Sequence, residues 1–196
     1  MERLLVYIMS KMFTLQEMEE MENIITSFLE QNKVVLNPPV DIFKFATSLG
    51  FDVRAAKFPK EIEGLIIVDE TSNKIGNFQS CKVIGYNIGV SLLKNKFVVA
   101  HELAHYIDEK MSPNNHGASI VVAAREPCGS EYSNNTDEQR KDYMAAAILI
   151  PKDDLLRKLP TDKSLLDDLF YEKLANYYRV DIRLAKRRVE EVSLWQ

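Results

Sequence analysis

The sequence predicts an α+β fold, in which a small, mainly antiparallel β-sheet packs with a helix that carries a His-Glu-x-x-His pattern. A helical C-terminal portion follows. Two observations support this fold class. Three short runs rich in β-branched residues follow one another within residues 51–87, and apolar residues recur at helical spacing before and after them. The 196 residues suffice for one sizeable domain.

The composition is that of an ordinary globular protein, with 46% apolar residues, 28% charged residues and a net charge of −4. This charge gives no overall attraction to nucleic acid or anionic lipid. Cys81 and Cys128 are too few for a disulfide framework, so we expect reduced thiols. The N-terminal stretch MERLLVYIMSKMF is too short for a membrane span and lacks the features of a signal peptide. We therefore expect a cytoplasmic protein.

Two helices are expected before the strands. The first covers about residues 15–31, because Thr14-Leu-Gln-Glu17 fits a capping box and apolar residues follow at helical spacing. The second is short, covers residues 41–49 and ends at Gly50. The three strands are expected at residues 51–54, 64–70 and 82–87.

The apolar period becomes helical again after the strands, over about residues 96–109. Residues 112–135 are rich in Ser, Asn, Gly and Pro and are expected to form a long loop. Thr136-Asp-Glu-Gln139 fits a second capping box and opens a helix that Pro151 ends. Two further helices are expected to begin at Ser164 and Asp181.

The stretch FVVAHELAHYIDEK, residues 97–110, holds two of the three histidines of the chain. His101 and His105 lie one helical turn apart and can point at one shared position. Glu102 lies about 100° further round the helix, where it could contact a water on a metal but is badly placed as a third ligand. This is the HExxH arrangement of two zinc ligands and a general base. The apolar flanks predict a buried helix, so we favour a zinc site over solvated surface histidines.

A catalytic zinc ion has three protein ligands and one open position, so a third ligand is needed. The metzincin class has a glycine and a histidine where this chain has Asp108 and Met111, which excludes that class. His116 lies in the expected loop, and we favour a surface position for it.

Glu138 is the favoured third ligand, with Asp137 and Glu131 as alternatives. Glu138 and Asp142 are four residues apart on one face of the helix expected after residue 136. In such a Glu-zincin layout Asp142 would orient a ligating histidine through a hydrogen bond. The competing interpretation of Glu138 is a carboxylate that the dipole at a helix N-terminus favours.

The expected chemistry follows from these assignments. A bound zinc ion lowers the pKa of its water toward about 7, and Glu102 takes the proton and later delivers it to the leaving amine. An oxyanion donor is also expected. Tyr106, Tyr132 and Tyr143 are candidates, although each is better explained as a core or rim residue.

With these residues in hand, the chain resembles the ImmA/IrrE family of bacterial and phage metallopeptidases. The resemblance implies that His101, His105 and Glu138 bind zinc. The family's Ala-Asn pair is Lys141-Asp142 here, and its Phe is Met144. Three stretches carry the resemblance: PPVDIFKFATSLGFDV (38–53), NKFVVAHELAHYI (95–107) and EQRKDYMAAAILIP (138–151).

The resemblance also implies a substrate class. It indicates a zinc-dependent endopeptidase that cuts a regulatory protein, typically a transcriptional repressor of a mobile element or of a stress response. The expected division of the chain is an N-terminal helical extension (1–36), a zinc metallopeptidase domain (37–160) and a C-terminal helix-turn-helix-like segment (161–196).

A second interpretation is a zinc-binding regulatory module that docks a partner or DNA without proteolysis. The helices on either side of Val180-Asp181 could form a helix-turn-helix with Lys186, Arg187 and Arg188 as a basic run. Acidic neighbours offset this charge, so we favour a packed helix pair and expect no direct nucleic-acid binding. A third, weaker hypothesis places the Cys128 thiolate at the open zinc position.

Overall fold

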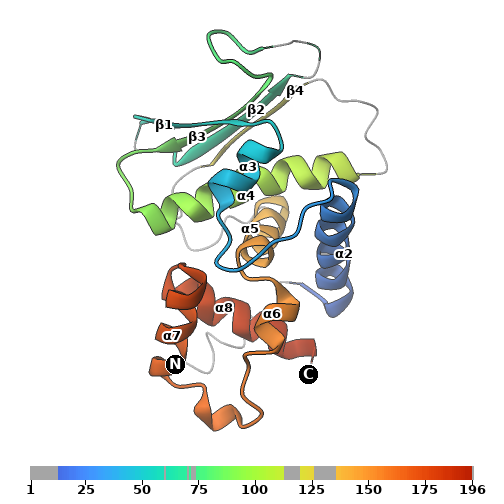
Figure 1. Cartoon of the computed structure of the whole chain (residues 1–196), viewed down its shortest axis with the longest axis vertical. Coiled ribbons are helices and arrows are strands. Elements are labelled where there is room, and N and C mark those ends of the chain that lie inside the picture. The colour runs from blue at the N-terminus through green and yellow to red at the C-terminus, as the bar shows by residue number, and fades with distance from the viewer. Residues whose placement is uncertain are drawn as a thin grey trace.

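The computed structural model describes residues 13–59, 61–69, 71, 74–112 and 136–195, and the backbone of residues 120–125. It confirms the predicted α+β architecture: the sheet lies at one end of the molecule, α4 crosses beneath it with α3 beside it, and the remaining helices follow below (Figure 1). The strands are β1 (Asp52–Ala56), β2 (Gly64–Asp69), β3 (Lys82–Asn87) and β4 (Ile120–Arg125). The helices are α2 (Leu15–Gln31), α3 (Ile42–Ser48), α4 (Leu92–Met111), α5 (Thr136–Leu149), α6 (Lys152–Leu156), α7 (Asp168–Tyr178) and α8 (Ile182–Val192), with the 3₁₀ turns η1 (Lys163–Leu165) and η2 (Ser193–Trp195).

The sheet has four strands in the order β1-β3-β2-β4. β3 pairs in parallel with β1 and antiparallel with β2, and β2 pairs antiparallel with β4. The sheet is therefore mainly antiparallel, as predicted. The three strands expected within residues 51–87 are all present, with small shifts at their ends.

The fourth strand corrects the expectation of one continuous loop over residues 112–135. β4 pairs with β2 along its whole length, from Gly64 opposite Arg125 to Asp69 opposite Ile120. Its sequence, IVVAAR, has the β-branched character of a strand. The Ser, Asn, Gly and Pro residues on both sides of it obscured this short signal. β4 forms one edge of the sheet.

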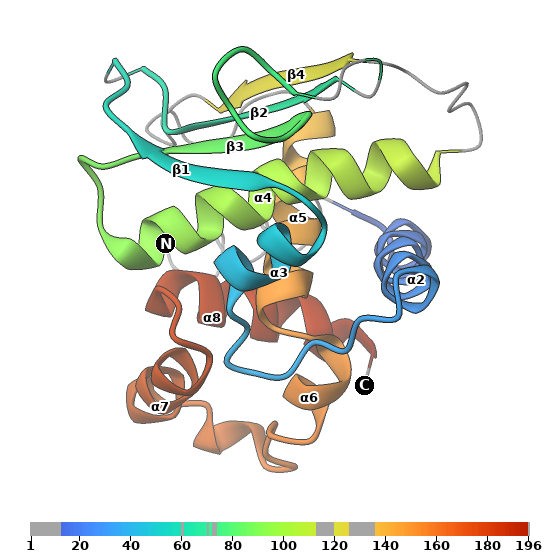
Figure 2. The ribbon, with the colours of Figure 1, turned by 45° about the horizontal axis from the view of Figure 1, so that its top comes forward.

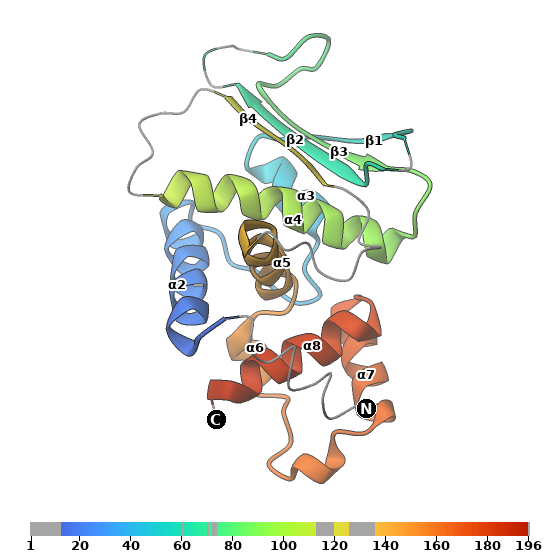
Figure 3. The same cartoon turned by 180° about the vertical axis from the view of Figure 1, so that it is seen from behind.

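Helix α4 lies between two layers. The sheet covers one side of it, and α2 and α5 pack on the other side (Figures 2 and 3). Ser91 caps its N-terminus by accepting a hydrogen bond from the backbone N–H of Lys94. The helix begins four residues earlier than predicted and is buried over most of its length. Among the described residues no helix, α4 included, has the length and apolar character that a bilayer span requires.

Helix α2 shows the predicted capping box. Thr14 accepts a hydrogen bond from the backbone N–H of Glu17, and its own N–H donates to the Glu17 carboxylate at 2.7 Å. The apolar face of α2 belongs to the same hydrophobic core as α4 and α5, so the expected N-terminal extension packs on the rest of the chain. The division into domains remains a prediction. The residues of α2 in this core are Met18, Met21, Ile25 and Phe28.

The first residue of one C-terminal helix differs from the prediction. Helix α7 begins after Asp167, which accepts from the backbone N–H of Phe170 at 2.7 Å, and not at Ser164. Ser164 lies in the separate turn η1, so the predicted start at Ser164 was wrong. Asp181 caps α8 as predicted.

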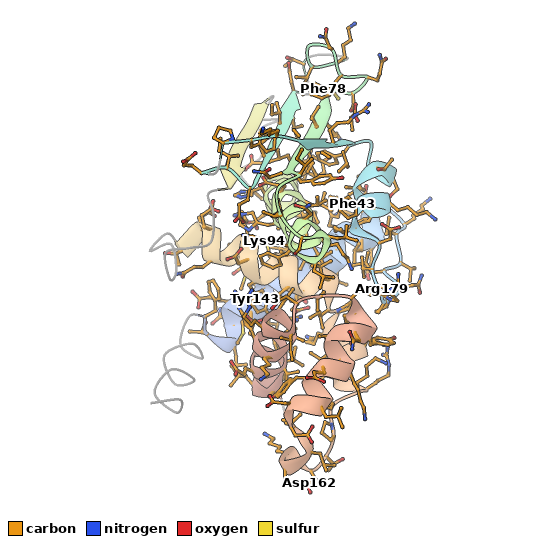
Figure 4. The ribbon with its side chains drawn as sticks, turned by 90° about the vertical axis from the view of Figure 1, so that its left-hand side faces the viewer. Phe43, Phe78, Lys94, Tyr143, Asp162 and Arg179 are labelled. Carbon is orange, nitrogen blue, oxygen red and sulfur yellow. The ribbon has the colours of Figure 1, made fainter. Side chains whose placement is uncertain are left out.

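Lys96 ties the turn between α7 and α8 to α4. Arg179, which lies at this turn (Figure 4), adopts the left-handed conformation with φ 53°. The Lys96 ammonium group donates to the carbonyls of Tyr178 at 3.4 Å and Arg179 at 2.9 Å. Burial lowers the pKa of Lys96. The C-terminal helix pair is thereby anchored to the helix that carries the histidines.

Each cation of the basic run in α8 has an acidic partner, which supports a packed helix pair. The contact of Lys186 is exposed, whereas the side chain of Arg188 is fully buried. The partners are Asp168 for Lys186, Glu191 for Arg187, and Glu22 and Glu191 for Arg188.

Arg188 joins three helices. Its guanidinium donates to the Ile150 carbonyl at 3.1 Å and to the Glu22 carboxylate, and it stands 5.1 Å from the centre of the Tyr143 ring. The Tyr143 hydroxyl donates to Glu22 at 3.0 Å, at the junction of α5 with the helices below it (Figure 4). Burial alone would lower the pKa of Arg188, but the Glu22 carboxylate raises it, so the guanidinium keeps its charge.

We predict that Arg188→Leu lowers the free energy of unfolding by about 3–5 kcal/mol, because it leaves the partly buried Glu22 carboxylate without its cation. Urea denaturation monitored by circular dichroism measures this change. Lys186→Met is the matched control, since its ion pair is exposed and little change in the midpoint is expected. Equal midpoints for the two variants would contradict the prediction.

We also predict that Gly64→Ala destabilises the protein by about 1–3 kcal/mol through overpacking. A Cβ atom at residue 64 would lie 2.3 Å from Cγ1 of Val98 and 2.9 Å from Oε1 of Glu102. Val98 is fully buried and has no room to move. In the control Gly89→Ala the nearest atom, Oδ1 of Asn87, is 3.4 Å away. The same denaturation experiment should separate the two variants, and equal stability of both would refute the close approach of β2 to α4.

Candidate metal centre

Three side chains from two helices converge beside α4. His101 and His105 lie on α4, and Glu138 lies on the first turn of α5. Nε2 of His101 is 3.1 Å from Oε2 of Glu138 and 3.2 Å from Nε2 of His105. Nε2 of His105 is 3.6 Å from Oε1 of Glu138. Within the described part of the chain, these three residues form the group of His, Cys, Asp or Glu side chains that could hold a metal ion.

The spacing of the two histidine nitrogens fits a tetrahedral ion. Ligand atoms that each lie about 2.0–2.2 Å from one zinc ion are about 3.3 Å apart when the coordination is tetrahedral. The two histidine nitrogens are 3.2 Å apart, and they face different oxygens of Glu138, with Oε2 at 3.1 Å from His101 and Oε1 at 3.6 Å from His105. One ligand atom from each of the three residues lies within 4.8 Å of the other two. Two imidazole nitrogens and a carboxylate are also a ligand set that zinc accepts. The donor set therefore fits the metal that the HExxH pattern predicts.

Asp142 fixes the ring of His101. Nδ1 of His101 lies 2.8 Å from Oδ1 of Asp142. An ionised carboxylate only accepts hydrogen bonds, so this contact places a proton on Nδ1 and leaves Nε2 of a neutral ring as an acceptor. Nε2 of His101 therefore faces a carboxylate oxygen of Glu138, and both atoms are hydrogen-bond acceptors. A cation between them would attract both atoms. The contact is the one expected for a residue that orients a ligating histidine.

His105 is held in its neutral form. Burial of its ring, followed by the electrostatic influence of the neighbouring His101, lowers the pKa of His105 to about 4. Its imidazole is therefore uncharged at pH 7. The neutral ring is the form that binds a metal ion.

Glu102 lies about 100° round α4 from His101, at the edge of the face that carries the histidines. It is fully buried and is not one of the three clustered residues. Its Oε1 atom lies close to the start of β2, because a Cβ atom at Gly64 would be only 2.9 Å from it. The carboxylate therefore sits between α4 and the sheet, whereas Glu138 approaches the histidines from α5. This agrees with the expectation that Glu102 is not a third ligand.

Of the two alternatives for the third ligand, Asp137 and Glu131, the structure describes Asp137. Asp137, next to Glu138, binds the ammonium group of Lys141 at 2.6 Å, and its side chain is 60% exposed. It is therefore engaged outside the cluster. Four residues considered in the sequence lie outside the described residues: His116, Cys128, Glu131 and Tyr132.

The two described tyrosine candidates for an oxyanion donor are engaged elsewhere. The Tyr106 hydroxyl accepts a hydrogen bond from Lys82 at 2.7 Å, and its ring packs on Phe51 in the core. The Tyr143 hydroxyl donates to Glu22 at 3.0 Å. Both positions agree with the alternative interpretation of these residues as core side chains.

Sequence reasoning missed a charged cluster beside the site. The carboxylate of Asp108 on α4 accepts hydrogen bonds from Arg140 and Lys141 of α5, at 2.7–3.1 Å. Burial alone would raise the pKa of Asp108, but these hydrogen bonds hold it below its ordinary value. Asp108 follows His105 by three residues, which is the one local signal that it shares a face with the histidines. Arg140 and Lys141, which bind Asp108, are far from it in sequence.

Gly64 is the second feature that the sequence did not single out. A glycine at the start of a strand often marks the close approach of another element. Here that element is α4, whose Val98 and Glu102 side chains occupy the space that a Cβ atom at residue 64 would need. The missing side chain allows the sheet to lie directly over the helix that carries both histidines.

The arrangement has the parts needed for hydrolysis assisted by a metal ion. Two neutral imidazoles and a carboxylate can hold a divalent cation, and the next residue on the same helix supplies a carboxylate that can exchange a proton.

No curated protein matches the chain. A family model does match it: Peptidase_M78, described as the IrrE N-terminal-like domain, covers residues 46–190. The match spans well over half of the chain and includes both helices of the candidate site, while α2 precedes it. The chain therefore belongs to the Peptidase_M78 family of metallopeptidases, as its resemblance to ImmA/IrrE proteins predicted.

Proposed function

We propose that the protein is a zinc-dependent endopeptidase that hydrolyses a peptide bond in a regulatory protein. Its metal ligands are His101, His105 and Glu138, and its general base is Glu102. The observation that carries the proposal is that one ligand atom each from His101, His105 and Glu138 lies within 4.8 Å of the other two, so that the three side chains can share one cation. Membership of a peptidase family supports the type of reaction.

The residues of the chain have distinct tasks in this mechanism. A zinc ion bound by the three ligands would lower the pKa of a water molecule toward about 7 and polarise the scissile carbonyl. Glu102 accepts the proton of the attacking water and later delivers it to the leaving amine. Asp142 holds the proton on Nδ1 of His101 and so keeps Nε2 available. The full burial of Glu102 shields this exchange from bulk solvent.

The proposed substrate is a transcriptional repressor of a mobile element or of a stress response. Its support is the family resemblance, which joins the metallopeptidase site to this class of regulator. The competing function is a zinc-binding module that acts by docking a partner without proteolysis. The two differ in whether the effect of the protein on its partner requires a general base.

We predict that Glu102→Gln lowers the rate of substrate cleavage by about 10²–10⁴-fold and leaves the zinc content unchanged. The amide cannot take a proton from water, whereas the three proposed ligands remain intact. The parent chain and the variant are each expressed with a candidate repressor, and new N-termini in the cell extract are labelled and identified by mass spectrometry. Zinc is measured by elemental analysis of the purified proteins.

Glu109→Gln is the matched control for this experiment, because it makes the same change on the same helix and should leave cleavage unaffected. A variant Glu102→Gln that cuts as fast as the parent would rule out the mechanism. Relief of repression by this variant without any new N-terminus would favour the docking module.

We predict that Glu138→Gln weakens zinc binding by more than the 10–100-fold typical of losing a group that only orients a ligand. Asp137→Asn is the matched control, since its carboxylate binds Lys141 in place of the histidines, and its effect should be smaller. Competition with a chromophoric chelator measures both dissociation constants. A larger effect of Asp137→Asn would show that the third ligand is assigned to the wrong residue.

A further inference from the structure

The Asp108 cluster, made of Asp108, Arg140 and Lys141, joins α4 to the turn of α5 that carries Glu138. We propose that Asp108 is a positioning residue for the metal centre: by binding Arg140 and Lys141, it fixes the Glu138 carboxylate relative to the two histidines. The inference rests on the metal-binding function proposed above. It adds to that function a residue outside the set of ligands.

The first step is the alignment of two helix faces. On α4, Asp108 follows His105 by three residues and His101 by seven, so the three side chains share one face. On α5, residues 141 and 142 follow Glu138 by three and four, and these side chains also share a face. The two faces meet through three sets of polar contacts: Glu138 with His101 and His105, Asp142 with His101, and Lys141 with Asp108.

The second step is the directionality of the Asp108 contacts. Arg140 binds the carboxylate with two nitrogens, Nε to Oδ2 at 3.0 Å and Nη2 to Oδ1 at 3.1 Å. The ammonium group of Lys141 donates to Oδ2 at 2.7 Å. A bidentate guanidinium contact fixes orientation as well as distance. The side chains are 16% exposed for Asp108, 22% for Arg140 and 7% for Lys141, so solvent screens these contacts less than surface pairs.

The third step is the location of Glu138 in the first turn of its helix. The backbone N–H groups of a first turn lack partners within the helix, and helix ends fray. A metal ligand, however, must hold its distance to within about 0.2 Å. The Asp108 cluster restrains this turn from both sides of Glu138, because Lys141 binds Asp137 at 2.6 Å in addition to Asp108.

A purely electrostatic role of Asp108 would change the zinc affinity of the Lys141→Met variant in the opposite direction. Lys141 is positively charged, so by itself it disfavours a second cation at the nearby site. If Asp108 served only to neutralise this charge, removing the charge with Lys141→Met would tighten metal binding. If the cluster positions Glu138, the same substitution loosens the turn and weakens metal binding.

The test compares zinc affinity among full-length variants by competition with a chromophoric chelator. We expect Asp108→Asn to weaken zinc binding by about 10–100-fold, and Lys141→Met to weaken it as well. The matched control is Asp154→Asn, which removes the charge of a carboxylate of similar exposure that contacts Arg157 and Tyr178 away from the site. Its zinc affinity should stay within about twofold of the parent.

Cobalt substitution gives a spectroscopic readout that general destabilisation does not affect. The visible absorption bands of bound Co²⁺ should change in Asp108→Asn and remain as in the parent in Asp154→Asn. Thermal unfolding of each variant shows whether it is folded at the assay temperature. If Asp108→Asn is not folded, Lys141→Met decides the question, because it retains the contact between Arg140 and Asp108.

Two results would overturn the inference: zinc affinity of Asp108→Asn within twofold of the parent with an unchanged cobalt spectrum, or tighter zinc binding by Lys141→Met. A parent chain that binds no zinc would refute the proposed function itself, and the inference with it. Zinc binding by the parent chain therefore separates a wrong inference about Asp108 from a wrong assignment of the metal site.

Discussion

The structure depends on one interaction: three groups that accept hydrogen bonds or bind cations meet within 3.1–3.6 Å of one another. Nε2 of His101 faces a carboxylate oxygen of Glu138, and both atoms are acceptors, so the elements that carry them must hold them together. His101 and His105 share a helix turn and meet through local geometry. Glu138 has to be brought from α5, and the packing of α4 against α5 accomplishes this.

The remaining architecture keeps α4 in place from both sides. The sheet covers the face near Glu102, and it approaches closely because Gly64 has no side chain. On the opposite side α2 and α5 contribute apolar residues to the same core. Lys96 extends this support to the C-terminal helices through the carbonyls of Tyr178 and Arg179. A helix that is packed between two layers is a rigid base for ligands that need fixed distances.

Local signals explain what the sequence predicted well. The capping box at Thr14, the positive φ of Gly50 and the cap at Asp181 each depend on neighbouring residues, and the structure shows all three. The four-residue spacing of the histidines is equally local. By contrast, β4 was missed because turn residues surround a short apolar run. The contacts of Asp108 and Gly64 depend on distances between elements, which spacing along the chain does not contain.

The two charged clusters show why a buried ion pair can serve where an apolar contact would not. An apolar contact changes little when two helices slide by a fraction of an ångström, because dispersion attraction has no direction. A bidentate guanidinium pair loses its hydrogen bonds under the same shift. At Arg188, separate hydrogen bonds from Nε to the Ile150 carbonyl and from Nη2 to Glu22 set where α8 meets α2 and α5. At Asp108 the bidentate pair sets the first turn of α5, where a small displacement would move the Glu138 carboxylate away from the histidines.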